Sequence, residues 1–276
     1  MLSYKHGYHA GNHADVLKHI VLIYLYNQLK KHDKSITYID THSGNGIYKY
    51  TSRYMDKTKE YIYGINKLEN YSGNNKLIIN YLRFLKKITE NNKFYPGSPF
   101  IIANISEVKD KLYLCELHNN EFKSLRINLS KFNNVKIINK SGFDYIKKLT
   151  NINNNFFILI DPSYEIKDDF KEIYNFIDNI ELNFQKAKIL IWYPILNYYE
   201  NDIFIETIRK KGISNILNIE LPILKDEDNR GMKGSGLLII NFNNKVIFKN
   251  LKLLIKELSL YLTDSKEVFK PKIRYF

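Results

Sequence analysis

The sequence predicts an α/β fold in which a mostly parallel sheet is covered by helices on both faces. Two observations predict it: strand-like and helix-like segments alternate along the chain, and most strand-like segments are continuously apolar, as in strands buried on both faces. The last two strands have only a short connection, which indicates an antiparallel pair. The expected strands lie at residues 35–40, 112–116, 135–139, 156–161, 187–194, 216–221 and 236–242.

A helix is expected before the first strand, ending near residue 31. Asn12 can cap its start, and Asp15 lies near the N3 position, where a carboxylate can accept from free backbone N–H groups. Apolar residues then recur at the spacing of one helix face, at Val16, Leu17, Ile20, Val21, Tyr24, Leu25 and Leu29. Residues 1–13 form an arm that precedes this helix.

Residues 48–94 differ in character from the rest of the chain. They are rich in Tyr, Lys and Asn, lack strand alternation, and indicate two or three helices. The segment 95–99, Tyr-Pro-Gly-Ser-Pro, is expected to be a rigid loop that closes them off. We therefore expect a main domain of residues 1–47 and 95–276, with 48–94 as a helical insertion subdomain.

Composition restricts the classes of function. The 276 residues carry 42 Lys and Arg against 29 Asp and Glu, a net charge of +13, which favours a polyanionic partner, although a solvated basic surface is the alternative. One cysteine, Cys115, excludes an internal disulfide and a cysteine zinc site, and suits the cytoplasm. We expect neither a signal peptide nor membrane association, because the longest apolar run, 20–26, is short.

Two strand ends predict a nucleotide-like ligand. The strand at 35–40 leads into residues 41–46, where Gly44 and Gly46 let the backbone approach a ligand closely; a plain tight turn is the alternative. Glu116 ends the next strand, where a carboxylate can accept from both hydroxyls of a ribose. An acidic helix cap is the alternative interpretation of Glu116.

The segment Asp161-Pro162-Ser163-Tyr164 follows a fully apolar strand and indicates transfer of a methyl group to an amine. The N6 amine of adenine is a poor nucleophile because its lone pair is delocalised into the ring. A carboxylate and a backbone carbonyl that accept its two N–H groups would direct that lone pair toward an electrophilic methyl. Pro162 would fix the carbonyl direction, and Tyr164 could stack on the base. A structural or metal-binding Asp-Pro turn is the alternative.

Four histidines near the N-terminus raise the possibility of a metal site: His6, His9, His13 and His19. No Asp or Cys completes a ligand set of regular spacing, so we expect no metal. The arm instead carries rings and positive charge, which favours a position over the active site, in contact with RNA and cofactor.

These motifs together resemble the RlmJ family, bacterial 23S ribosomal RNA adenine-N6 methyltransferases. The resemblance extends nearly end to end. Its opening segment is especially distinctive, and its most specific parts are residues 2–6, 9–19, 40–44, 95–99, 116–118, 161–162, 192–194 and 230–232.

The resemblance implies a class I methyltransferase fold, with a Rossmann-like, mostly parallel seven-stranded sheet, and S-adenosylmethionine as cofactor. It implies that Asp161 is the catalytic group, and that Tyr4, His6 and Lys18 lie at the substrate beside Pro162 and Tyr164. The cofactor residues expected from the resemblance and from the glycine loop are His19, His42, Gly44, Ser98, Glu116, Ser141, Gly142 and Asp161.

The implied substrate is 23S rRNA, free or in an early assembly intermediate, and the implied enzyme is a monomer without metal. Two positions depart from the family: Ser163 replaces a proline, and Ser141 replaces an aspartate. Both departures keep Asp161. Methylation of DNA adenine or of a protein glutamine remains an alternative, as does an RNA-binding methyltransferase fold that has lost turnover.

Overall fold

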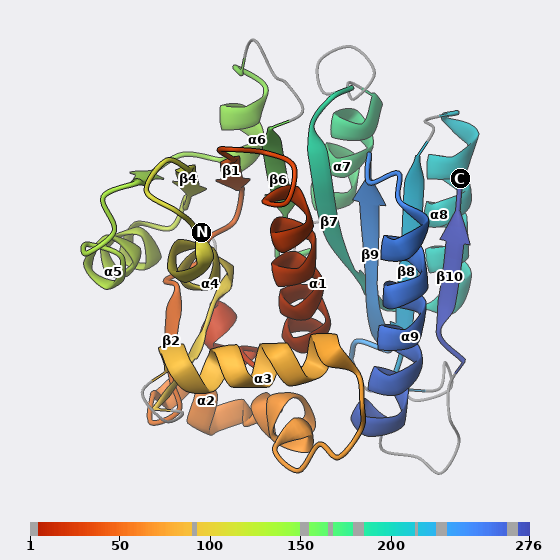
Figure 1. Ribbon diagram of the computed structural model, residues 1–276, viewed down its shortest axis with the longest axis horizontal. Coiled ribbons are helices and arrows are strands. Elements are labelled where there is room, and N and C mark those ends of the chain that lie inside the picture. The colour runs from red at the N-terminus through yellow and green to blue at the C-terminus, as the bar shows by residue number, and fades with distance from the viewer. Residues whose placement is uncertain are drawn as a thin grey trace.

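The computed structural model describes residues 5–89, 93–149, 155–164, 168–178, 185–212, 215–224, 231–263 and 270–276. Their main feature is an eight-stranded sheet of order β10-β8-β9-β7-β6-β1-β4-β5 (Figure 1). The strands are β1 (Thr37–Asp40), β4 (Lys111–Cys115), β5 (Val135–Ile138), β6 (Phe156–Ile160), β7 (Lys188–Ile195), β8 (Ile216–Pro222), β9 (Gly234–Ile240) and β10 (Lys272–Tyr275).

The sheet is parallel from β5 through β4, β1 and β6 to β7. Strand β9 lies between β7 and β8 and is antiparallel to both, which confirms the antiparallel pair expected near the C-terminus. The sequence predicted seven strands, and the eighth is β10, which pairs with β8 in antiparallel register. It was missed because four residues with Lys272 and Arg274 among them show no apolar run.

Helices cover both faces of the sheet, as the sequence predicted. Alternate side chains of β6 point to opposite sides: Phe157 and Leu159 belong to one hydrophobic core, and Ile158 and Ile160 to the other. The first core includes side chains of α1 (His13–Leu29), α4 (Ser98–Ile105), α5 (Asn119–Asn128) and α9 (Lys245–Leu262). The second includes side chains of α6 (Gly142–Ile146), α7 (Asp168–Asp178) and α8 (Tyr198–Lys210).

Helix α1 begins as predicted, because the Asn12 side chain accepts hydrogen bonds from the N–H groups of Ala14 and Asp15. The helix is not one-sided, however: nearly every residue from His13 to Tyr26 is buried. It packs against β9, α3, α4 and α9 at once. Its polar residues Asp15, Lys18 and His19 are therefore inside the protein, where each needs a partner.

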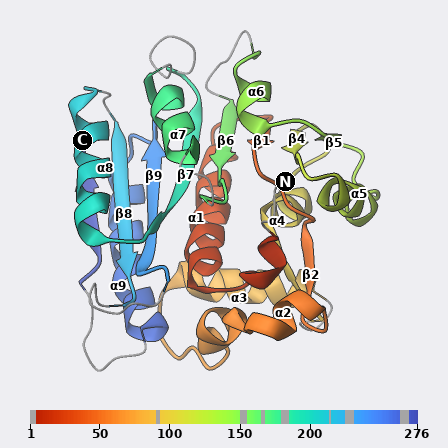
Figure 2. The same ribbon diagram turned by 180° about the vertical axis from the view of Figure 1, so that it is seen from behind.

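The segment expected as a helical insertion contains α2 (Arg53–Thr58), two 3₁₀ helices (Glu60–Tyr63 and Ile65–Leu68) and α3 (Lys76–Ile88). Figure 2 shows these elements together below the main sheet, and α2 contacts the 3₁₀ helix His6–Tyr8 near the start of the chain. Two short strands, β2 (Ile47–Lys49) and β3 (Phe94–Pro96), pair in antiparallel register at its two ends. This pair was not predicted, because three residues are too few to show alternation. The expected loop at 95–99 was wrong, because Tyr95 and Pro96 belong to β3 and Ser98 begins α4.

The segment 48–94 contacts the N-terminal arm closely. The N–H of Ile65 donates to the carbonyl of Gly11 at 2.9 Å. A Cβ atom on Gly64 would lie 2.1 Å from that same carbonyl oxygen, so only glycine fits there. Within the described ranges, no helix has the length and apolar character needed to cross a membrane.

Candidate active site

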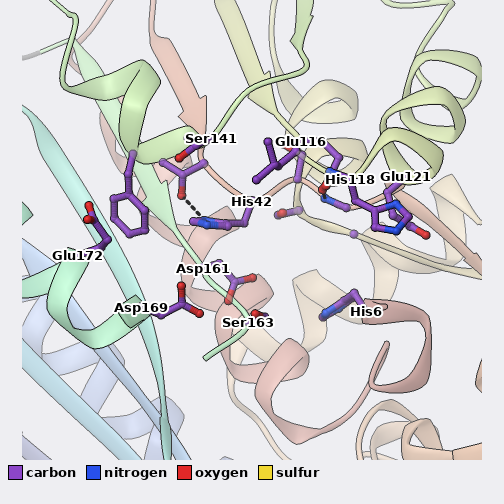
Figure 3. A pocket seen from close by; sticks show the side chains of 18 of the residues that line it. His6, His42, Glu116, His118, Glu121, Ser141, Asp161, Ser163, Asp169 and Glu172 are labelled. Atoms are coloured by element: carbon purple, nitrogen blue, oxygen red, sulfur yellow. Dashed lines mark hydrogen bonds between the residues drawn. The ribbon is translucent and has the colours of Figure 1, made fainter. Parts of the chain in front are cut away.

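A cavity of about 350 Å³ lies beside the loops that follow β1, β4 and β6. In Figure 3, Asp161 is near the centre of the labelled side chains, with His6 on one side and Asp169 on the other. The expected site residues that line the cavity are His6, Lys18, His42, Gly44, Ser98, Glu116, Ser141, Gly142 and Asp161. The topology therefore brings together residues from separate segments of the chain.

Three expected site residues do not line this cavity: His19, Pro162 and Tyr164. The Tyr164 hydroxyl donates to the Trp192 carbonyl at 2.5 Å, and its ring packs against Phe170 and Trp192. In this conformation Tyr164 therefore supports the loop after β6, and stacking on a base stays a prediction. Tyr4 lies outside the described residues.

The carboxylate of Asp161 is held from α1. Lys18 Nζ donates to Asp161 Oδ2 at 2.5 Å and lies 2.9 Å from Asp15 Oδ1. The other oxygen of Asp15 accepts from the Gly11 N–H and pairs with His6 Nε2, each at 2.9 Å. One continuous chain of polar contacts thus joins Asp161 to the N-terminal arm.

The charges in this chain stabilise one another. Burial alone would raise the pKa of Asp15, but His6, Lys18 and His19 outweigh it and hold that pKa well below its usual value. Burial alone would lower the pKa of Lys18, but the carboxylates of Asp15 and Asp161 raise it above its usual value. Lys18 is therefore a fixed ammonium at neutral pH, and Asp15 is ionised.

The carboxylate of Glu116, at the end of β4, is fixed by the backbone. Its Oε2 accepts from the Gly44 N–H at 2.8 Å, and its Oε1 accepts from the His118 N–H at 2.7 Å. Burial raises the pKa of Glu116, while these two N–H groups oppose the shift. Because a carboxylate oxygen has two lone pairs, each oxygen can still accept from a ligand hydroxyl in the cavity.

The loop after β1 positions His42. The Thr41 hydroxyl donates to the Leu159 carbonyl at 3.0 Å, and it lies 2.8 Å from His42 Nδ1. A hydroxyl has one hydrogen, so His42 Nδ1 donates to Thr41, and Nε2 is an acceptor. Burial lowers the pKa of His42 to about 4, although Asp161 opposes the shift, so the ring is neutral at pH 7.

Asp40, which was not among the expected site residues, supports Ser98. The Ser98 hydroxyl donates to Asp40 Oδ2 at 2.7 Å, and Tyr38 donates to the same oxygen at 3.2 Å. Burial raises the pKa of Asp40 to about 6. The available signal was its place at a strand end, directly before the glycine loop. Asp15 was considered only as a partner for helix N–H groups, and its contacts with Lys18 and His6 were missed.

The start of α6 packs against the loop after β1 without room for a side chain. A Cβ atom on Gly142 would lie 2.2 Å from the Thr41 carbonyl oxygen. The Ser141 hydroxyl accepts from the Asp144 N–H and caps this helix. The backbone at Gly142, the fixed carboxylate of Glu116 and the glycine loop together suit the binding of a nucleoside through its ribose and its base.

The four N-terminal histidines do not all meet at one position, although His6 and His19 both lie beside Asp15. His6 contacts Asp15, His9 contacts Glu60 at 2.9 Å, and His19 Nδ1 lies 2.9 Å from the Tyr95 hydroxyl. His13 is buried at the start of α1. Across the described part of the chain, no group of three or more His, Cys, Asp or Glu residues is arranged to hold a metal ion.

Two of these histidines predict an acid-sensitive fold. Burial lowers the pKa of His13 to about 4 and that of His19 to about 3, with Glu60 and Asp15 opposing. In the unfolded chain both should titrate near 6.5. Their stabilising effect is therefore fully present above pH 6.5 and is lost as the pH falls, because only the unfolded chain then takes up protons.

Between pH 6 and pH 5, the two histidines should together lower the free energy of unfolding by about 2 kcal/mol. Urea unfolding at both pH values measures this slope. In His19→Gln this change in the free energy of unfolding should be about 1 kcal/mol smaller than in the wild type, and replacement of the exposed His32 should leave it unchanged. An equal slope in all three proteins would contradict the assignment.

The sheet order, the glycine loop after β1, the carboxylate after β4 and the Asp-Pro segment after β6 define a class I S-adenosylmethionine-dependent methyltransferase. The family described as Ribosomal RNA large subunit methyltransferase D, RlmJ, matches residues 33–264. The chain belongs to this family.

Two curated relatives and one solved structure are similar to this chain over most of its length. Ribosomal RNA large subunit methyltransferase J of Haemophilus influenzae is 39% identical over 245 residues, with 87% of each chain covered. The protein of the same name in Escherichia coli is 36% identical over 244 residues, again with 87% of each covered. The crystal structure of protein LPL1258 from Legionella pneumophila superposes with a TM-score of 0.87 at 34% identity, covering 97% of this chain and 98% of that one.

Proposed function

We propose that this enzyme methylates the N6 amine of an adenine in 23S ribosomal RNA. The observation that carries the proposal is the carboxylate of Asp161, which lies at the cavity on the loop after β6 and is held by Lys18. The relatives' names support ribosomal RNA of the large subunit as the substrate. The net charge of +13 suits a polyanion.

The cofactor would occupy the side of the cavity formed by the loops after β1 and β4 and by the start of α6. Glu116 would accept from the ribose hydroxyls, and Gly44 and Gly142 would allow close approach of the backbone. His42, Ser98 and Ser141 would contribute polar contacts from the same walls. His19 would act indirectly, through Tyr95. S-adenosylmethionine supplies an electrophilic methyl group when it is bound.

The substrate amine would meet Asp161. Among the described residues, Lys18 is the hydrogen-bond partner of this carboxylate and uses Oδ2, which leaves Oδ1 to accept an N–H of adenine. An accepted N–H localises the amine lone pair on nitrogen and fixes its direction. Correct alignment of two reacting groups can supply roughly 7–11 kcal/mol of a barrier. Pro162 fixes the backbone beside this carboxylate, and Tyr4, His6 and Tyr164 would contact the RNA.

The proposal also covers the location of the enzyme, its oligomeric state and the form of its RNA substrate. We propose that the enzyme acts in the cytoplasm as a monomer without metal, on free 23S RNA or an early assembly intermediate. Extrusion of the adenine costs a few kcal/mol unless the base is already unpaired, which favours RNA that has not yet been folded into the ribosome.

Mass spectrometry of 23S RNA from cells that lack this protein tests the proposal. One N6-methyladenosine should be missing, and the wild-type gene should restore it. The purified enzyme should methylate protein-free 23S RNA and leave DNA of the same sequence unmodified. Unchanged 23S RNA in the deletion strain, or equal transfer to DNA, would contradict the proposal.

A further inference from the structure

Five side chains of the arm and of α2 form a cluster at the surface: Lys5, Tyr8, Arg53, Tyr54 and Lys57. The Tyr54 hydroxyl accepts from Lys5 Nζ and from Arg53 Nη2, each at 2.8 Å. Lys5 and Arg53 also lie over the Tyr54 ring, each 4.8 Å from its centroid. Lys57 lies 5.7 Å from the centroid of Tyr8, which packs edge-on against Tyr54.

The three cations of this cation–tyrosine cluster contact rings rather than carboxylates. Among the residues that the structure describes, the two nearest acids in sequence have other partners: Asp56 pairs with Lys59 at 3.2 Å, and Glu60 pairs with His9. The two hydrogen bonds lower the pKa of the Tyr54 hydroxyl, as two nearby positive charges should. The cluster therefore carries about three positive charges that no carboxylate of the described residues neutralises.

The cluster is attached directly to the wall of the active site. Lys5 immediately precedes His6, which lines the cavity and pairs with the buried Asp15. Gly7 lies against Tyr54, since a Cβ atom there would be 3.2 Å from Tyr54 Cβ. The Thr58 hydroxyl donates to the Tyr8 carbonyl. These contacts hold the arm on α2 and fix the cations next to the cavity.

We propose that the cation–tyrosine cluster binds the phosphodiester backbone of the RNA segment next to the target adenine. Lys and Arg donate to phosphate oxygens, and contact with a tyrosine ring holds each cation in place before the RNA arrives. Lys5 and Arg53 already lie against the Tyr54 ring, and Lys57 lies against the Tyr8 ring. The cluster therefore binds the RNA backbone rather than stacking on bases. This inference rests on the proposed function, because it assumes an RNA substrate in the cavity.

The test is the salt dependence of RNA binding by the triple variant Lys5→Gln, Arg53→Gln, Lys57→Gln. Each lost phosphate contact on a single strand should lower the slope of log K against log salt by about 0.7, and three contacts by about 2. A matched control replaces Lys245, Lys249 and Lys252 by Gln. These exposed lysines lie on α9, on the other side of the molecule from α2 (Figure 1). The probe is an unmethylated 23S RNA transcript in filter binding.

In the triple variant the slope of log K against log salt should be smaller by about 2, and the KM for RNA should rise about tenfold or more. Its kcat should stay within about twofold of wild type, and its cofactor affinity should be unchanged. The α9 control should keep the wild-type KM. Equal losses in both proteins would show that only net charge matters and would overturn the proposed location. A fall in kcat at unchanged KM would also overturn it. If the wild-type protein fails to methylate the transcript at all, the proposed function is what fails.

Discussion

Replacement of Asp161 by alanine is expected to lower the rate of methyl transfer about a thousandfold or more, since one preorganised group at a reacting centre contributes roughly a hundredfold to a thousandfold and alignment of the amine is lost with it. Cofactor binding should weaken but remain measurable, because Glu116 and the backbone at Gly44 and Gly142 are unchanged. Single-turnover transfer to 23S RNA measures the rate, and calorimetry measures cofactor affinity.

Two further variants make this result specific. Asp161→Asn keeps one oxygen acceptor without the charge, and its rate should fall between wild type and Asp161→Ala. Asp144→Ala removes an exposed carboxylate that lines the same cavity, and it should transfer methyl groups at nearly the wild-type rate. Full activity in Asp161→Ala would refute the proposed mechanism. An equal loss in Asp144→Ala would mean that the cavity needs negative charge rather than a positioned acceptor.

Local sequence patterns predicted the strands and the helix start that position the candidate site at one edge of the sheet. The Asn12 cap, the apolar strands before Asp40 and Asp161, and the carboxylate of Glu116 all follow from patterns within a few residues. Because the carboxyl ends of parallel strands meet at one edge, these patterns also predicted that Gly44, Glu116 and Asp161 would lie together, and all three line the cavity. For most of the other expected positions that line it, among them Lys18, Ser98 and Gly142, the expectation came from the family resemblance.

The features that the sequence did not predict are contacts between distant residues and the directions of side chains. The Lys18–Asp161 contact joins residues 143 positions apart, and the arm-to-insertion contacts depend on packing that no local pattern records. Residue type also does not indicate the backbone φ of 55° at Tyr164 or the packing of its ring against Trp192, and stacking of Tyr164 on a base stays a prediction. Local pattern predicts where a residue lies along a strand edge, whereas partners and side-chain direction depend on the whole fold.

Replacement of Asp15 by asparagine should be the most destabilising change in the site. Asp15 is buried and pairs with both Lys18 and His6. Removing one member of a buried ion pair leaves an ammonium without full compensation, which costs about 3 kcal/mol. Because the pKa of Asp15 is depressed, its stabilising effect is fully present above its ordinary pKa near 4 and is lost only as the pH falls below that value. Urea unfolding at pH 7 therefore measures the whole effect.

A surface pair of the same spacing provides the control. Asp56 and Lys59 are also three residues apart on a helix end, but both are exposed, and Asp56→Asn should change the free energy of unfolding by less than about 1 kcal/mol. The double variant Asp15→Asn, Lys18→Met should be more stable than Asp15→Asn alone, because it removes the ammonium whose charge is no longer balanced.

Methyl transfer separates the positioning role of Asp15 from its effect on stability. Assayed well below its melting temperature, Asp15→Asn should raise the KM for RNA, because His6 and the arm lose the carboxylate that holds them beside the cavity. The double variant should regain stability without regaining activity, since Asp161 then lacks Lys18. If stability and activity recover together, Asp15 serves only the fold. If the KM for RNA rises in Asp15→Asn while all of the protein is folded, the chain of contacts from the arm to Asp161 contributes to substrate binding.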